Sequence, residues 1–134
     1  MNRKLARENT FILLFEAECR NDETALEIYE YAKELGEFEL DEYVKKVFFG
    51  VFERRKEIDE LIDANLLGWN KRRVSPVSRA LLALSTYEML ALDDVPAKVS
   101  INEAIELSKK YDDEKSYIFV NGVLNAVADV LKVK

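Results

Sequence analysis

Residues 95–124, VPAKVSINEAIELSKKYDDEKSYIFVNGVL, have the pattern of two amphipathic helices joined by a short polar turn. Apolar residues recur at helical spacing on both sides of Asp112 and Asp113, which interrupt the pattern. Ser100, with a glutamate three residues later, matches a capping box and predicts that the first helix begins there. Gly122 lies inside the second helix and predicts a close packing contact, because glycine costs roughly 1 kcal/mol relative to alanine in a helix interior.

The turn between these helices carries a basic and polar cluster that core packing does not explain. Its members are Lys109, Lys110, Lys115 and Ser116, with Tyr111, Tyr117 and Phe119 close in sequence. Two further cationic clusters are Arg3, Lys4 and Arg7, and Lys71, Arg72, Arg73 and Arg79. Such cations bind phosphate, and neighbouring aromatic rings stack on bases. Each cluster also fits a solvated helix face, so the residues alone leave nucleic-acid binding open.

Helical spacing of apolar residues continues through nearly all of the 134 residues, among which only two are proline and four are glycine. The spacing therefore predicts an all-α fold of about seven helices in a single domain, residues 1–134. Predicted landmarks are a first helix over Arg3–Arg20, a second over Glu23–Leu35 ended by Gly36, a third from Asp41 with a break near Arg54, and a central buried helix from Ser75-Pro76 to Leu92.

The first helix is predicted to bury one side and to expose the other. The apolar side holds Leu5, Ile12, Phe15 and Cys19, and the opposite side holds Arg3, Arg7 and Thr10. Cys19 is the only cysteine, so an internal disulfide cannot form, and we expect its thiol to be buried and unreactive.

Composition argues against an enzyme and favours a binding protein. The chain has no histidine, no cysteine cluster and only isolated glycines, so we expect no cofactor, no metal and no catalysis. No secretion signal or membrane span is apparent, and a cytoplasmic protein is expected. The net charge of −6, with nine acidic residues and one lysine in residues 22–42, also allows a protein–protein adaptor that does not bind nucleic acid.

Three segments together resemble the NusB family of bacterial transcription antitermination factors. The most specific is VPAKVSINEAIELSKKY (residues 95–111) followed by FVNGVLN (residues 119–125). The second comprises Trp69, Arg73-Val74-Ser75, Arg79-Ala80-Leu81-Leu82 and Thr86-Tyr87-Glu88-Met89-Leu90. The third is Arg3 with Ala6-Arg7-Glu8. They occur in order over nearly the whole chain.

The resemblance implies two small helical bundles packed against each other. It also implies a non-catalytic protein that binds boxA RNA as a heterodimer with NusE, a protein of the small ribosomal subunit. That complex would join other Nus factors on RNA polymerase and suppress termination, chiefly in ribosomal RNA operons. A homodimer is a further expectation when the partner surface is free.

The resemblance also suggests site residues. For RNA binding they are Arg3, Lys4, Arg7, Lys115, Ser116 and Phe119, and for partner binding they are Arg79, Tyr87 and Glu88. The RNA set requires the start of the first helix to lie beside the start of the last. Leu5 stands where family members often continue a run of arginines, so we expect RNA affinity to be low without the partner.

Overall fold

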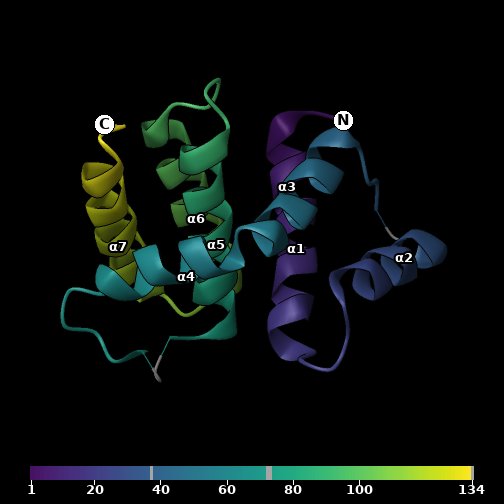
Figure 1. Cartoon of the computed structure of the whole chain (residues 1–134), viewed down its shortest axis with the longest axis horizontal. Helices are drawn as coiled ribbons and strands as arrows, with labels where there is room; N and C mark the ends of the chain where they lie inside the picture. The colour runs from purple at the N-terminus through teal and green to yellow at the C-terminus, as the bar shows by residue number, and fades with distance from the viewer. Residues whose placement is uncertain (37, 72–73, 134) are drawn as a thin grey trace.

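The computed structural model describes residues 1–36, 38–71 and 74–133, and within these ranges it contains seven α-helices and no strand (Figure 1). The helices are α1 (Arg3–Cys19), α2 (Ala25–Leu35), α3 (Glu42–Glu53), α4 (Arg55–Ala64), α5 (Pro76–Ala91), α6 (Ala97–Tyr111) and α7 (Ser116–Leu131). The all-α fold predicted from apolar spacing is confirmed. Across the same ranges, every helix is too short or too polar to cross a membrane.

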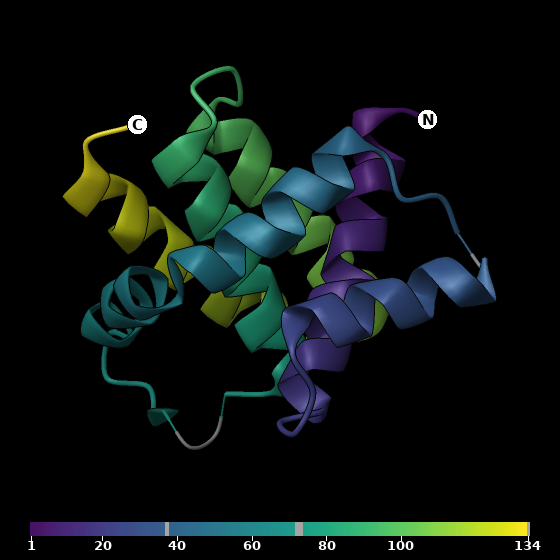
Figure 2. The same ribbon diagram turned by 45° about the vertical axis from the view of Figure 1, so that its right-hand side comes forward.

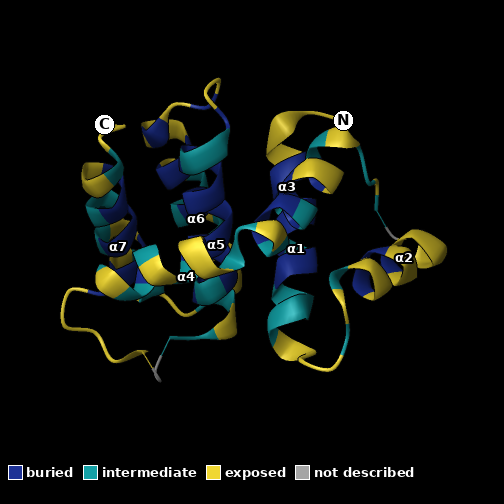
Figure 3. Cartoon of the chain, viewed as in Figure 1, coloured by how far each residue is buried: buried dark blue, intermediate teal, exposed yellow. Residues whose placement is uncertain are grey.

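The helices form two groups that meet at α5. In one group α1, α2 and α3 pack on one another, and in the other α4, α6 and α7 pack with α5. The groups join where α5 contacts α1 and α3 (Figures 1 and 2). As predicted, α5 is buried nearly all round, and most of its length is dark blue in Figure 3. One hydrophobic cluster therefore runs through both groups.

Several helix ends lie where local sequence signals predicted them. The Ser75 side chain accepts a hydrogen bond at the start of α5, and Pro76 is the first residue of that helix. Gly36 ends α2 in the left-handed conformation, with φ of 62°. The long apolar run in the middle of the chain is interrupted at Arg54, between α3 and α4.

The predicted capping box at Ser100 is wrong. Helix α6 begins three residues earlier, at Ala97, after Pro96. Ser100 is buried, and its hydroxyl donates to Glu88 Oε1 at 2.8 Å and shares a hydrogen bond with Ser85. Ser100 and the glutamate three residues later lie inside α6 and contact side chains of other helices instead of capping α6.

The predicted orientation of α1 is also wrong. Arg7 and Thr10 are buried, whereas Leu5 and Cys19 are exposed. The reason is that α1 packs between α3 and α5, so a wide stripe of its surface is buried. Its polar members are satisfied internally: Thr10 donates to the Ala6 carbonyl at 2.8 Å, and Arg7 pairs with acidic side chains.

The close packing predicted at Gly122 occurs instead at Gly50 in α3. A Cβ atom on Gly50 would collide with the ring of Tyr87, which lies across it from α5. At Gly122 the nearest atom to such a Cβ would be Leu67 Cδ1 at 3.7 Å, an ordinary contact. Glycine at position 50 thus lets α3 and α5 approach each other.

Candidate functional site

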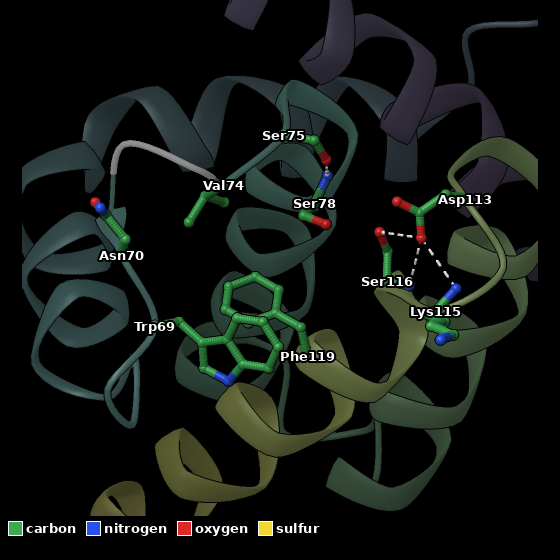
Figure 4. A pocket seen from close by; sticks show the side chains of 9 residues that line it. All are labelled: Trp69, Asn70, Val74, Ser75, Ser78, Asp113, Lys115, Ser116 and Phe119. Atoms are coloured by element: carbon green, nitrogen blue, oxygen red, sulfur yellow. Dashed lines mark hydrogen bonds between the residues drawn. The ribbon is translucent and has the colours of Figure 1, made fainter.

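Lys115 and Ser116 form the start of α7, where a carboxylate already occupies the helix terminus. The backbone N–H groups of both residues donate to Asp113 Oδ1 at 2.9 Å, and the Ser116 hydroxyl donates to the same atom at 3.0 Å (Figure 4). The hydrogen bonds from Lys115 and Ser116 lower the pKa of Asp113. The Lys115 side chain is exposed and is the cation at this end of the helix.

Beside this terminus is a hollow of about 360 Å³ with an aromatic wall. Trp69 is 55% exposed and packs edge-on against Phe119, with ring centroids 5.1 Å apart (Figure 4). Phe119 itself is buried, so it supports the wall and Trp69 presents the surface. Ser75 and Ser78 also line the hollow.

The two serines tie the start of α5 to the turn between α6 and α7. The Ser75 hydroxyl donates to Asp112 Oδ2 at 2.7 Å, and the Ser78 hydroxyl donates to the same atom at 3.2 Å. This contact fixes the turn relative to α5. The aromatic wall and the start of α7 are therefore held in one place.

The remaining lysines of the turn differ in how they are engaged. Lys109 Nζ lies 4.8 Å from the centroid of the Tyr117 ring. Lys110 pairs with Glu8 of α1 at 2.6 Å, and the Tyr111 hydroxyl donates to the same carboxylate. These two hydrogen bonds lower the pKa of Glu8.

Arg7 lies in a buried polar network and not on a surface that RNA could reach. Its side chain is 4% exposed and pairs with Glu88, which is fully buried, at 3.0 Å. Glu88 also accepts from the Tyr43 hydroxyl at 2.7 Å and from Ser100. Burial lowers the pKa of Arg7, but the hydrogen bond and charge of Glu88 outweigh this effect and raise it overall. The guanidinium therefore stays charged and holds α1 to α5.

Arg3 and Lys4 are exposed at the start of α1, but both have neighbours. Lys4, with a side chain 72% exposed, pairs with Glu103 at 3.2 Å. The Arg3 guanidinium lies 4.5 Å from the centroid of the Tyr43 ring. An exposed ion pair of this kind is weak, so Lys4 can exchange its carboxylate for a phosphate at little cost.

The predicted RNA set requires the start of α1 to lie beside the start of α7, but the two helix starts lie apart. Lys4 pairs with Glu103 and Glu8 pairs with Lys110, so α1 runs parallel to α6. Eight residues separate Glu103 from the end of α6, a distance of about 12 Å. In Figures 1 and 2 the N-terminus is at the top and α7 starts lower, on the other side of α5.

The hollow between these two places is unfavourable for phosphate. It lies along α1 and α6, and its three cations, Lys4, Arg7 and Lys110, are matched by three carboxylates, Glu8, Glu103 and Glu106, so its lining has no surplus positive charge. The predicted single surface is therefore corrected to two separate cationic places, one at Arg3 and Lys4 and one at Lys115 beside Trp69.

The residues predicted to bind the partner lie largely inside the protein. Glu88 belongs to the Arg7 network, and Tyr87 is buried against Gly50. Arg79 is mostly covered and pairs with Asp63 at 3.2 Å. They can shape a partner surface from beneath, but Glu88 cannot touch a partner. Two cations of the predicted middle cluster, Arg72 and Arg73, lie outside the described residues.

Sequence reasoning missed the two aromatic residues that define these places. Trp69 is absent from the predicted site residues, although a lone tryptophan after Gly68 in a loop is a usable signal of exposure. Tyr43 lies in the first turn of α3, and its hydroxyl completes the Glu88 network. Nothing in its local spacing indicates that partner, which is 45 positions away.

Comparison with known proteins identifies the family. The model described as "NusB family" matches residues 4–129. Transcription antitermination protein NusB from Clostridium perfringens (strain SM101) is 43% identical over 136 residues, which cover 98% of this chain and all of the relative. The NusB of Listeria monocytogenes serovar 1/2a is 44% identical over 128 residues, 96% of this chain and 97% of the relative.

Solved structures agree with this match. NusB from T. maritima superposes with a TM-score of 0.84 at 37% identity, covering 96% of this chain and 92% of that chain. A complex of the antitermination factors NusB and NusE with double-stranded RNA holds a chain with a TM-score of 0.81 at 30% identity, covering 96% of both. The protein therefore belongs to the NusB family.

Proposed function

We propose that this chain is a transcription antitermination factor that binds boxA-type RNA together with NusE. The observation that carries the proposal is the likeness over 96% of both chains to the protein in the complex of NusB, NusE and double-stranded RNA. Curated relatives at 43–44% identity bear the name transcription antitermination protein. The chain acts by binding, without catalysis or cofactor, as a single domain in the cytoplasm, where RNA polymerase and other Nus factors complete the assembly.

In this proposal RNA contacts the two separated cationic places. At the first, Arg3 and Lys4 neutralise phosphates. At the second, Lys115 meets phosphate and a base stacks on Trp69, with Phe119 as support and Ser116 at the edge of the hollow. Arg7 contributes indirectly, because it fixes the helix that presents the first place.

NusE is proposed to bind near α5, where Arg79 and Tyr87 support the surface. A polar hollow between α3 and α5 is one candidate, because Lys45, Lys46, Glu42 and Glu53 surround the covered ring of Tyr87 there. When NusE is absent, the same surface can join two copies of the chain. Sedimentation of the chain with and without NusE tests this arrangement.

The test of the function is fluorescence anisotropy with labelled single-stranded boxA RNA, with and without purified NusE. Binding should weaken as salt rises and strengthen when NusE is added. The slope of log affinity against log salt concentration should become shallower by about 1.4 in the variant Arg3→Ala/Lys4→Ala. This value assumes the loss of two phosphate contacts, each worth about 0.7 for a single strand.

Lys33→Ala, which removes an exposed cation of α2, is the matched control and should leave the slope unchanged. A duplex of the same sequence tests whether single strands are preferred. If no RNA complex forms at moderate salt even with NusE, the chain is a protein adaptor and the proposal is overturned.

A further inference from the structure

A further hollow, of about 560 Å³, lies between α6 and α7, on a different face of α6 from the hollow beside α1. Its polar lining consists of three amides and one cation, Asn102, Asn121, Asn125 and Lys98. The buried side chain of Ile101 contributes to its apolar part. In the described part of the chain, no carboxylate lines this hollow, in contrast to the one along α1.

Helical spacing joins this hollow to the turn at the start of α7. On α6, Lys98, Asn102 and Lys109 follow one another at intervals of four and seven residues, so they share a face. On α7, Tyr117, Asn121 and Asn125 recur every four residues. Lys109 lies over the Tyr117 ring at one end, and the amides and Lys98 meet in the hollow at the other. Lys98 and Lys109 are separated by about 16 Å along α6.

The amides of α7 are held in a fixed arrangement. Asn125 Nδ2 donates to the Asn121 carbonyl at 2.9 Å and to Asn121 Oδ1 at 2.8 Å. This pairing uses the donor of Asn125 and the acceptor of Asn121. It leaves Asn125 Oδ1 as an acceptor and Asn121 Nδ2 as a donor on neighbouring turns, and base edges carry both donors and acceptors that such groups can bind.

We propose that this amide groove (Lys98, Asn102, Lys109, Asn121 and Asn125) holds a continuation of the RNA strand beyond the Trp69 hollow. The proposal rests on the RNA-binding function proposed above. Cations at both ends suit phosphates, the amides between them suit base edges, and carboxylates are missing from the described lining of the hollow. The hollow along α1 is the less favourable route, because three glutamates balance its three cations.

The experiment compares three labelled RNAs, a boxA core, the same core lengthened at its 5′ end and the same core lengthened at its 3′ end, in titrations of the full chain with NusE. One of the two lengthened RNAs should bind the unaltered chain more tightly than the core. Lys98→Ala/Asn102→Ala should remove that gain, a loss on the order of tenfold, and leave core binding unchanged. Both side chains are exposed, and circular dichroism verifies the fold of the variant.

Lys33→Ala is the control, because it removes an exposed lysine from α2. If the unaltered chain gains nothing from either extension, or if the variant keeps the gain, the groove does not bind RNA, while core binding still supports the proposed function. A variant that loses NusE affinity but keeps the gain would instead make the groove a protein surface. Failure of the core itself to bind would overturn the proposed function and with it this proposal.

Discussion

At the scale of single residues, the buried pair of Arg7 and Glu88 decides how the two helical groups are joined. Glu88 is fully buried and receives hydrogen bonds from α1, α3 and α6 through Arg7, Tyr43 and Ser100. Burial, followed by the charge of Glu88 and the hydrogen bond to it, raises the pKa of Tyr43 well above its ordinary value. Tyr43 and Arg7 therefore both keep their protons and donate to Glu88.

Arg7→Ala should lower the free energy of unfolding strongly, because Arg7 supports the fold and does not contact RNA directly. The substitution leaves the Glu88 carboxylate buried without its main cation, which typically costs about 3–5 kcal/mol. Urea unfolding of the variant and of Lys4→Ala, whose side chain is exposed, measures the difference. If the Arg7→Ala protein were as stable as Lys4→Ala and its RNA binding depended less on salt, we would conclude that Arg7 contacts RNA.

Trp69→Ala should weaken RNA binding with little effect on folding. The ring is more than half exposed, and loss of a base–aromatic stack typically costs about 1–3 kcal/mol, roughly five- to 150-fold in affinity. Anisotropy in the presence of NusE gives the affinity. Tyr31→Ala is the control, because it removes an exposed ring from α2. Equal RNA affinity in the two variants would contradict stacking on Trp69.

At the scale of elements, helix type and most helix ends were predictable because they depend on local chemistry. Ser75 with Pro76 and the left-handed Gly36 act within one or two turns. What failed depended on distant partners. Arg7 and Thr10 are buried because two other helices cover them, and Ser100 faces Glu88 across a helix pair. The separation of Lys4 from Lys115 follows from the parallel course of α1 and α6, which no motif encodes.

The crossing of α3 and α5 should tolerate no side chain at position 50. Gly50→Ala places a methyl group in the Tyr87 ring and should cost about 1–3 kcal/mol, as overpacking does. Gly122→Ala, where only Leu67 comes near, should be neutral or should stabilise α7 by up to roughly 1 kcal/mol. Chemical denaturation of both variants checks the contrast, and a reversed order would mean that the closest helix contact is at α7.

At the scale of the whole molecule, one hydrophobic cluster spans both helical groups, so they should unfold together. Trp69 is the single tryptophan and reports on the group containing α4–α7, whereas far-ultraviolet circular dichroism reports on all helices. The two signals should give coincident urea transitions at neutral pH. Separate transitions would mean that α1–α3 form an independent unit, contrary to the proposed single domain.

Acid should loosen the contact between the groups through Glu8, which joins α1 to Lys110 and Tyr111 of α6. The pKa of Glu8 is lowered from its ordinary value of 4.5, so its ionised form stabilises the fold above about that pH. This contribution disappears as the pH falls through the lower, folded-state pKa. Stability measured by urea midpoints should therefore fall more steeply with acid in the unaltered chain than in Glu8→Gln. Glu34→Gln, an exposed change on α2, should retain the steep fall, and equal slopes in all three proteins would show that Glu8 does not couple the groups.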